Sequence, residues 1–417
     1  MKRLVFHVDV NSAFLSWEAV RHLERTGEDL RLIPSAIGGN PEKRTGIILA
    51  KSIPAKKMGV VTGEPISMAL RKCPELVLAR PDFHLYQQNS HALMEICRQY
   101  APTLEKFSID ECFLDMTGTG LLYPDPVKTA HELKDRIYGE LGFTVNIGIG
   151  ENKLLAKMAS DFEKPNRVHT LFSHEIQEKL WPLPVGDLFM TGKATVEKLH
   201  KINIFTIGEL ANMNLSSLQA LLGQKHGAAL YARARGEDDS PVLSQPEDAK
   251  GYSISTTLEE DVTEIGEANR ILLALADSVA TRMRKDGAKA ACIAVTIRAN
   301  DFKNHSHQQS LSAPTDGTME IYEIARALFA ALWDKSTPLR LLGISLTQLS
   351  RKEEGQLSFF SDAKRKKEEK LDKTVDGIRA RFGTDTVMRG AVYKSPLDVG
   401  RKYKKRPEEK DGTTPDE

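Results

Sequence analysis

The amino-acid sequence predicts an α+β fold organised in several domains. Residues 4–10 are an apolar run typical of a buried strand, and residues 107–115 indicate two short strands joined by an acidic turn. Helical periodicity covers 84–101 and 126–141, and another strand is expected over 143–150. The order strand, helix, hairpin, helix, strand predicts a mainly antiparallel sheet with helices packed on one of its faces.

The first helix is expected to follow the first strand directly. Asn11 or Ser12 is suited to cap its N-terminus, and Gly27 is suited to end it. The segment 31–77 mixes short β-like runs with proline and glycine, which indicates a small subdomain inserted in the first domain. A further helix is expected over 152–163, where a Lys-Pro step stops it.

The rest of the chain changes character several times. Residues 168–238 contain short helices with glycine-bearing turns, and residues 239–250 are polar and contain proline, as linkers do. β-Rich runs return over 251–350, together with two helices. Residues 351–417 form a highly charged tail in which an amphipathic helix is expected over 364–382.

Length and composition describe a globular protein. A chain of 417 residues is too long for one core, so two to four domains are expected. No apolar run approaches the roughly 20 residues of a membrane span. The net charge is only +1, so any nucleic-acid binding must come from local patches. The four cysteines show no paired spacing, which favours reduced thiols in a cytoplasmic protein over zinc or disulfides.

Three carboxylates stand at the ends of predicted strands. Asp9 ends the first apolar run, and Asp110 and Glu111 form the acidic turn. Such a pair is usually a solvated turn, but carboxylates delivered by buried strands repel one another unless a cation balances them. Oxygen ligands favour Mg²⁺, and a pair of these ions supports phosphoryl transfer. The residues alone leave both interpretations open. A structure that places Asp9 far from Asp110 and Glu111, or that buries one of them in an ion pair with a lysine, would overturn the metal site.

Three motifs match those of a known family in order and spacing. They are Asp9-Val10-Asn11-Ser12-Ala13-Phe14, Ser108-Ile109-Asp110-Glu111, and residues 152–161 with Lys164-Pro165-Asn166. Over roughly residues 1–350 the chain resembles the Y-family translesion DNA polymerases, in particular the bacterial DNA polymerase IV and V branch. This resemblance implies a right-hand polymerase with a ferredoxin-like palm, small fingers, a helical thumb and a β-rich little finger. The implied domains are the palm at 1–11 and 78–167, the fingers at 12–77, the thumb at 168–238 and the little finger at 251–350.

The resemblance also implies what the carboxylates do. Asp9, Asp110 and Glu111 would be catalytic and would bind two Mg²⁺ ions, with the carbonyl of Val10 as a further ligand. One ion would lower the pKa of the primer 3′-hydroxyl, and the other would hold the triphosphate and neutralise the leaving pyrophosphate. The implied function is DNA-directed DNA polymerase performing error-prone translesion synthesis by two-metal-ion nucleotidyl transfer, as part of DNA repair and the SOS response to DNA damage.

Contacts with the nucleotide are implied on the palm and the fingers, at Ser12, Ala13, Phe14, Lys56 and Lys164. Phe14 would be the steric gate that rejects a ribose 2′-hydroxyl, and its alternative is an ordinary core aromatic. The alternative for Lys164 is a surface lysine that ends a helix.

The family pattern is broken at three positions. A fingers motif that commonly reads Tyr-x-x-Arg has Ile53 and Lys56 here. Ile53 therefore cannot donate a hydrogen bond, and Lys56 lacks the bidentate fork of arginine. Arg167 replaces a common glycine, and the sequence does not indicate the consequence.

Contacts with DNA and with a partner protein are implied farther along the chain. In the thumb they are Thr191, Gly192 and Lys193, although the usual first glycine of that hairpin is absent. In the little finger they are Ser253, Ser255, Thr256, Arg298 and Lys303, for which polar sheet edges are the alternative. The tail peptide resembles the one by which bacterial polymerases dock on the sliding clamp, and the alternative is that its aromatic rings fold back on the little finger. Its residues are Gln356, Leu357, Ser358, Phe359 and Phe360.

We therefore expect a monomeric cytoplasmic polymerase that uses primer-template DNA, deoxynucleoside triphosphates and Mg²⁺, and that does not bind a membrane. Two rival interpretations are weaker. A non-catalytic scaffold of the same fold has no use for the three carboxylates, which this chain retains. A nucleotide cyclase with a similar palm would leave the thumb, the little finger and the tail peptide unexplained.

Overall fold

The computed structural model describes residues 3–40, 46–335, 337–351, 363–384 and 386–392. These residues divide into two compact units, one within 1–38 and 47–246 and the other within 39–46 and 247–417. Both units contain sheets and helices, which confirms the predicted α+β class. The expected boundaries among palm, fingers and thumb fall inside the first unit and stay predictions.

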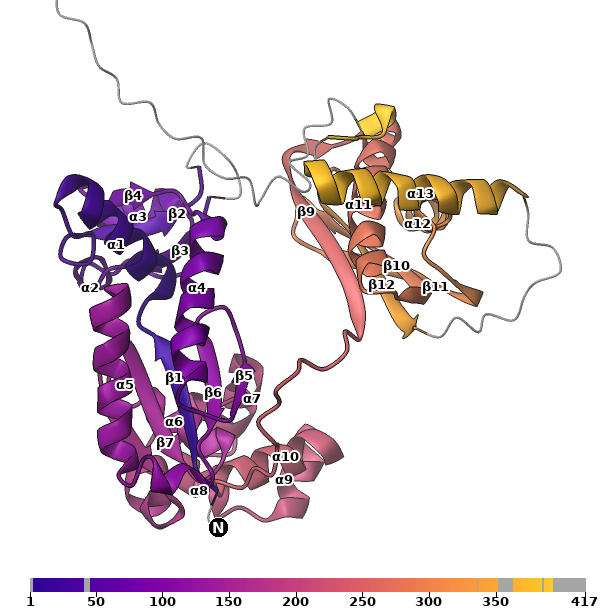
Figure 1. Ribbon diagram of the computed structural model, residues 1–417. Coiled ribbons are helices and arrows are strands. Elements are labelled where there is room, and N and C mark those ends of the chain that lie inside the picture. Colours follow the sequence, from indigo (N-terminus) through magenta and orange to yellow (C-terminus); the bar gives the residue numbers. More distant parts are fainter. Residues whose placement is uncertain (1–2, 41–45, 336, 352–362, 385, 393–417) are drawn as a thin grey trace, which may run out of the picture. The chain divides into compact units, whose positions relative to one another are not determined.

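The first unit is built on a five-stranded sheet with the strand order β5-β6-β1-β7-β8 (Figure 1). Its central strand β1 pairs antiparallel with both neighbours, and only β7 and β8 run parallel. The strands are β1 (Val5–Val10), β5 (Thr103–Lys106), β6 (Glu111–Asp115), β7 (Val145–Gly150) and β8 (Val168–Leu171). The sheet is therefore mainly antiparallel, as expected.

Helices cover both faces of this sheet, so the expectation of helices on one face is wrong. On one face, Phe6, Val8 and Val10 share a core with α4 (Phe83–Arg98) and α5 (Pro126–Leu141). On the other face, α6 (Lys153–Ser160) packs over Val5, His7 and Asp9. Every residue of β1 is buried, as in strands covered on both sides. The sequence does not indicate this second layer, because the helix that forms it, α6, has only eight residues.

Two glycines in β7 allow α6 to lie directly on the sheet backbone. A Cβ at Gly148 would stand 2.0 Å from the carbonyl oxygen of Ala156 and 2.4 Å from the amide nitrogen of Ser160. At Gly150 it would stand 2.7 Å from the amide nitrogen of Ala156. Only glycine permits this approach, which brings the polar face of α6 over the end of β1.

A smaller layer follows β1, as predicted for the subdomain over 31–77. It contains a three-stranded sheet in the order β3-β2-β4, with a core of its own that includes Ala36, Ile48 and Ile66. Its elements are α1 (Ala13–Thr26), β2 (Ser35–Gly38), β3 (Ile48–Lys51), α2 (Ile53–Lys57), α3 (Ile66–Lys72) and β4 (Val77–Ala79).

Short helices follow β8, in agreement with the predicted change of character. Beyond several single turns they are α7 (Lys193–His200), α8 (Ile207–Ala211), α9 (Leu215–Leu222) and α10 (Gln224–Ala234). Their core includes Leu199, Leu210 and Leu230, and it is continuous with Leu155 and Met158 of α6. The helix α6 thus packs on the sheet with one side and on the helical region with another.

The second unit contains a four-stranded antiparallel sheet in the order β11-β10-β12-β9. Its elements are β9 (Gly251–Val262), α11 (Ile265–Lys285), β10 (Lys289–Ala299), β11 (Asn304–Thr315), α12 (Thr318–Leu332) and β12 (Leu339–Ser350). The two helices share one core with the inner face of the sheet. Residues on the other face of β9 are exposed, so this sheet is covered on one side only.

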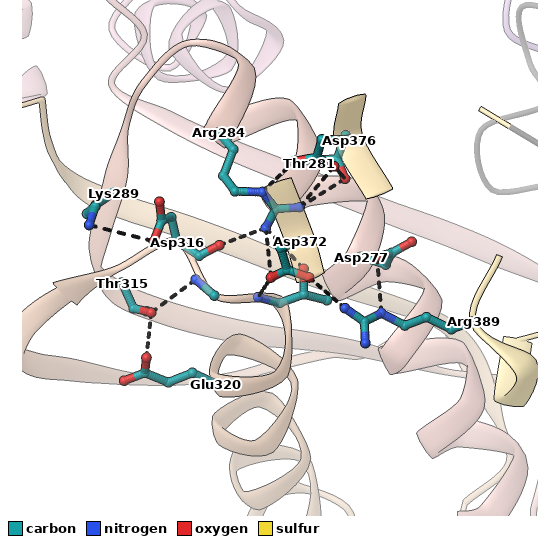
Figure 2. Close-up of polar contacts among 12 residues, drawn as sticks. Asp277, Thr281, Arg284, Lys289, Thr315, Asp316, Glu320, Asp372, Asp376 and Arg389 are labelled. Carbon is teal, nitrogen blue, oxygen red and sulfur yellow. Dashed lines mark hydrogen bonds and ion pairs between the residues drawn. The ribbon is translucent and has the colours of Figure 1, made fainter. Parts of the chain in front are cut away.

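The helix α13 (Ala363–Phe382) matches the helix expected over 364–382, and it belongs to the second unit. Asp372 of this helix is 3% exposed and accepts the amide N–H of Thr318 at 2.9 Å, at the start of α12. Arg284 of α11 contacts Asp376 at 2.6 Å, and Arg389 contacts Asp372 at 2.7 Å (Figure 2). One face of α13 is therefore a polar interface, ion-paired with Arg284 of α11 and hydrogen-bonded to the start of α12.

Candidate active site

Strand pairing brings the three predicted carboxylates together at one end of the first sheet. Asp9 and Glu111 are directly opposite residues of β1 and β6, so their side chains leave the same face. Asp110 stands in the turn just before β6, where its carbonyl accepts the amide N–H of Val10 at 3.1 Å. Asp9 and Glu111 point to the face covered by α6, and Asp9 is only 6% exposed.

These carboxylates form part of a cleft of about 560 Å³ within the first unit. Clefts of roughly 300–1,000 Å³ are the usual size for small-molecule sites. The cleft is also lined by β3 and the following helix α2 of the smaller layer. All the palm and fingers residues that the sequence singled out line it: Asp9, Val10, Ser12, Ala13, Phe14, Lys56, Asp110, Glu111 and Lys164.

Two lysines lie among the carboxylates. The ammonium of Lys157, on α6, is 3.0 Å from Glu111 and 3.6 Å from Asp9. Lys164 is 2.5 Å from Asp9 and 2.8 Å from Asp161. This is the buried ion pair that counts against a metal site in the sequence argument. In the described part of the chain, no group of three His, Cys, Asp or Glu side chains is arranged to hold a metal ion.

The environment separates the two neighbouring acids of the turn. Burial raises the pKa of Asp110, the negative charges of Asp9 and Glu111 raise it further, and the Ser108 hydroxyl that donates to it at 2.6 Å opposes the shift. Burial alone would also raise the pKa of Glu111, but the contacts with His7 and Lys157 outweigh it and lower the pKa to about 2. Glu111 is therefore the stabilised anion, and Asp110 is the carboxylate that lacks compensation.

His7 lies beneath Glu111 on β1 and is fully buried. Its Nδ1 is 2.8 Å from the hydroxyl of Ser160, which itself donates to the carbonyl of Lys157. The other ring nitrogen is 3.6 Å from Glu111 and has no hydrogen-bond partner among the described residues. Burial lowers the pKa of His7, so the ring is held mainly neutral, and its polar contact with Glu111 favours the ionised form of that carboxylate.

A pair of buried amides holds the segment that carries Lys164. Asn11 donates to Asn146 at 3.1 Å, and its own oxygen accepts the amide N–H of Asn166 at 2.9 Å. Asn146 donates to the carbonyls of Ser160 and Glu163 at 3.1 and 2.6 Å. Both ends of the loop between α6 and β8 are thus fixed to the first sheet.

Phe14 has features of both interpretations that the sequence allows, because it is packed among aromatic side chains and also faces the cleft. Its ring stacks on Tyr86 with a centroid distance of 4.6 Å, and Trp17 and Phe83 lie about it at 6.0 Å. The same side chain is only partly buried and lines the cleft. It is therefore a wall of the cleft that aromatic packing holds in place.

The N-terminus of α1 faces the cleft through Ser12 and Ala13. Ser12 occupies the N-cap position with a φ of 48°, but its side chain caps no amide in the described structure, in contrast to the expectation. The amide N–H groups of the first helical turn therefore stay free to meet an anion.

The wall opposite the carboxylates comes from β3 and α2. Ser52 caps α2 by accepting the amide N–H of Ala55 at 3.1 Å. Ile53 is 51% exposed and lines the cleft beside Lys56, so an apolar side chain occupies this position of the motif.

Sequence reasoning gave no role to two lysines of this cleft. Lys157 stood inside a quoted motif, but only the packing of α6 revealed that it meets Asp9 and Glu111. Lys51 ends β3 and also lines the cleft. Its position two residues before Ile53 was the only signal in the sequence, and that signal does not specify a direction for the side chain.

The predicted DNA contacts lie outside the cleft. Thr191 and Gly192 precede α7, and Lys193, its first residue, is exposed. Ser253, Ser255 and Thr256 are on β9, Arg298 is on β10, and Lys303 lies in the turn to β11. Lys303 pairs with Asp301 at 2.9 Å, which reduces its net charge toward DNA. The tail peptide Gln356–Phe360 lies outside the described residues.

Comparison with known proteins places the chain in a family. Residues 8–161 match the impB/mucB/samB family, residues 249–359 match the C-terminal domain of that family, and residues 187–238 match the thumb domain of DNA polymerase-iota. A solved Y-family DNA polymerase chimera has the same fold, with a TM-score of 0.72 and 22% identity over 83% of this chain and 98% of its own. The chain belongs to the Y family of DNA polymerases, and the enzyme class of this family is the DNA-directed DNA polymerase.

Curated relatives narrow the comparison within that family. DNA polymerase IV of Clostridium acetobutylicum is 43% identical over 94% of this chain and 98% of its own length. DNA polymerase IV of Alkaliphilus oremlandii is 37% identical over 94% and 99%. DNA polymerase IV 1 of Bacillus subtilis is 36% identical over 94% of each chain. No helix in the described ranges is both long and apolar enough to cross a membrane.

Proposed function

We propose that this chain extends a primer on damaged DNA templates, and that the cleft between β1, β6 and α2 is its active site. The observation that carries the proposal is the convergence of Asp9, Asp110 and Glu111 in a nucleotide-sized cleft that Phe14 and four lysines also line. Primer-template DNA and deoxynucleoside triphosphates are the substrates. The enzyme acts in translesion synthesis and copies with low fidelity.

The residues fit a divalent cation by type, because carboxylate oxygens and the carbonyl of Val10 are hard ligands. Asp110 is the group that favours a cation most, since burial and two like charges disfavour its ionised form. Lys157 and Lys164 balance Asp9 and Glu111 in the described structure, so at least one of these lysines would leave its carboxylate for the residues to hold two Mg²⁺ ions. When bound, the ions supply an activated primer 3′-hydroxyl and neutralisation of the leaving pyrophosphate.

The residues of the chain then have separate tasks. Asp9 and Glu111 provide carboxylate oxygens as ligands on one face of the sheet, and Asp110 provides a further carboxylate from the turn. Lys164 exchanges its contact with Asp9 for the triphosphate, and Lys56 and the free amides at Ser12 and Ala13 bind the same phosphates. Phe14 closes the cleft on the sugar side and excludes a 2′-hydroxyl.

Contacts beyond the cleft complete the proposal. The thumb residues Thr191, Gly192 and Lys193 and the little-finger residues on β9 and β10 bind the DNA backbone without reading its sequence. The peptide Gln356–Phe360 docks the enzyme on the sliding clamp. The enzyme works as a monomer in the cytoplasm, as part of the SOS response.

Primer extension tests the proposal. Wild type and Asp110→Ala are compared on a labelled primer with all four deoxynucleoside triphosphates and Mg²⁺, and again with EDTA. We expect extension by wild type with Mg²⁺ only, and a loss of at least about a thousandfold in the variant, the scale at which a catalytic electrostatic contact acts. Equal extension by both proteins, or extension by wild type in EDTA, would refute the carboxylate site.

Asp161→Ala is the matched control for this experiment. Asp161 also lines the cleft and contacts Lys157 and Lys164, but it is not in the proposed ligand set. We expect it to retain extension. Thermal unfolding of all three proteins shows whether a loss of activity has a structural cause.

A further inference from the structure

Two lysines lie on the fingers wall of the cleft, which is the side formed by β3 and α2. The proposed mechanism assigns a role to only one of them. Lys56 comes from α2 and has a proposed phosphate contact. Lys51 is the last residue of β3, where it pairs with Ala36 of β2, and it lines the same cleft. Nothing in the sequence motif assigns it a role.

A hydrogen bond fixes the ammonium of Lys51. Its Nζ donates to the hydroxyl of Thr62 at 3.0 Å, and Thr62 is itself a residue of the cleft lining. The side chain is half-buried, and burial followed by the positive charge of Lys56 lowers its pKa. Two cations therefore face the same space although they repel each other.

Neighbouring acids do not relieve this repulsion. Glu64 is the acid whose charge favours the protonated form of Lys51, but its carboxylate contacts Lys72 at 2.6 Å and accepts the amide N–H of Val61 at 2.7 Å. Within the described residues, no carboxylate lies within ion-pair distance of Lys51 or Lys56. Among the residues that the structure describes, the two lysines thus have no ion-pair partner.

On the palm side of the cleft, by contrast, the lysines are paired with carboxylates. Lys157 and Lys164 are shared among Asp9, Glu111 and Asp161, all at 3.6 Å or less. The cleft lining as a whole has four carboxylates and four lysines. Among the described residues, the positive charge without an ion-pair partner is on the fingers wall, so an anion in the cleft is attracted to Lys51 and Lys56.

We propose that Lys51 binds the phosphates of the incoming deoxynucleoside triphosphate together with Lys56, and that Thr62 holds it in place. This inference rests on the proposed function. It also accounts for Ile53, which cannot donate a hydrogen bond where the family motif commonly has a tyrosine. Lys51 is two residues away and supplies a charged donor to the same wall of the cleft.

Steady-state kinetics of single-nucleotide insertion tests this assignment with Lys51→Ala. A charge-assisted contact to phosphate is worth about a factor of ten in binding. We expect the KM for the deoxynucleoside triphosphate to rise by about tenfold with kcat little changed, and Lys51→Arg to restore most of the loss. Thr62→Val should raise KM less, because it removes only the support.

Lys57→Ala is the matched control. Lys57 is adjacent to Lys56 on α2 and is exposed, but it does not line the cleft. We expect its KM to equal that of wild type. An equal rise in Lys57→Ala would mean that general electrostatics, and no specific contact, explains the effect, and this would overturn the assignment.

Two further measurements keep the inference separate from the proposed function. Titration with a non-hydrolysable deoxynucleoside triphosphate measures nucleotide binding by Lys51→Ala directly. It remains informative even if wild type fails to extend a primer, which is the result that would refute the proposed polymerase site. The affinity for primer-template DNA is measured as well, for Lys51→Ala and for Lys57→Ala. Unchanged nucleotide binding in Lys51→Ala, or a loss confined to DNA affinity, would show that Lys51 does not bind the triphosphate.

Discussion

At the scale of single residues, the site is a balance of charges on one face of a sheet. Asp9 and Glu111 are stabilised by Lys157 and Lys164, whereas the Asp110 carboxylate accepts a hydrogen bond from the hydroxyl of Ser108 and contacts neither lysine among the described residues. The same sequence pair, Asp-Glu, therefore contains one acid with a lowered pKa and one with a raised pKa. Glu111 has the lowered pKa because it belongs to β6, within reach of Lys157 on α6, whereas Asp110 lies in the turn before this strand.

The lowered pKa of Glu111 predicts a pH-dependent stability of the metal-free protein. A group whose folded-state pKa falls from 4.5 to about 2 contributes stability that is fully present above its unfolded value and is lost as pH falls through the folded value. We expect the free energy of unfolding of wild type to exceed that of Glu111→Gln above about pH 5. Urea titrations in EDTA should show this advantage shrinking between pH 4.5 and 2. A difference that is constant across this window would contradict the assigned shift.

Phe14 makes a second prediction at this scale. If its ring is the wall that excludes a 2′-hydroxyl, Phe14→Ala should raise ribonucleotide incorporation relative to deoxyribonucleotide by about tenfold or more, since steric discrimination is worth on the order of 1–3 kcal/mol. Insertion kinetics with both sugars measures this ratio.

Phe83→Ala is the matched control for Phe14. Phe83 lies 6.0 Å from the ring of Phe14 in the same aromatic cluster but does not line the cleft. It should leave sugar selection unchanged, and an unchanged preference in Phe14→Ala would remove the gate assignment.

At the scale of elements, α6 is the piece that assembles the site. It brings Lys157 over the carboxylates, and its Ser160 contacts His7 beneath them. It can do so because β7 has glycine at the two positions below the helix. Its other side shares a core with the following helices, so the position of one short helix couples two hydrophobic cores.

Gly148→Ala tests this coupling. A Cβ would meet the helix backbone at 2.0 Å, and backbone cannot move aside as a flexible side chain can. We expect the variant to lose on the order of 3 kcal/mol of stability, the upper end for an overpacked core. Primer extension should fall as well, because α6 and Lys157 are displaced.

Gly139→Ala is the control for this substitution. Gly139 lies in α5, and an added Cβ there meets nothing within 4 Å. Replacing glycine by alanine in such a helix should gain about 0.5–1 kcal/mol. Chemical unfolding measures both variants, and equal stability of Gly148→Ala and wild type would disprove the close approach.

At the scale of the whole molecule, the two units divide the proposed work. The first unit contains the cleft, and the second contains a sheet with one uncovered face and the ion-paired helix α13. The net charge of the chain is +1, so binding of DNA depends on local patches. In the proposed function, docking on a clamp raises processivity through a second binding contact.

Deleting residues 356–360 tests the clamp proposal in the full chain. We expect distributive synthesis without clamp to equal that of wild type, because these residues belong neither to the proposed active site nor to the proposed DNA contacts. Stimulation by added clamp should be abolished, and a processivity assay measures it. Stimulation that persists after the deletion would rule out this peptide as the docking site.

Much of this protein was determined by the sequence alone. The buried strand that carries Asp9, the helix over 364–382 and the α+β class all follow from patterns of adjacent residues. Local patterns suffice for these features because strand and helix periodicity are properties of a few neighbouring residues. The acidic hairpin was placed wrongly in part: its first strand is Thr103–Lys106, before the predicted range 107–115, and Glu111 begins the second strand instead of standing in the turn.

Only the tertiary structure decided what surrounds the carboxylates. The pairing of Asp9 with Glu111, the lysines that balance them and the second helical layer all involve residues more than 40 positions apart in the chain. Lys51 and Lys157 look like ordinary lysines in the sequence, and their significance comes from which way a strand end and a helix face point. The physical reason is that electrostatic interactions depend on distance in space, which chain folding sets and sequence order does not reveal.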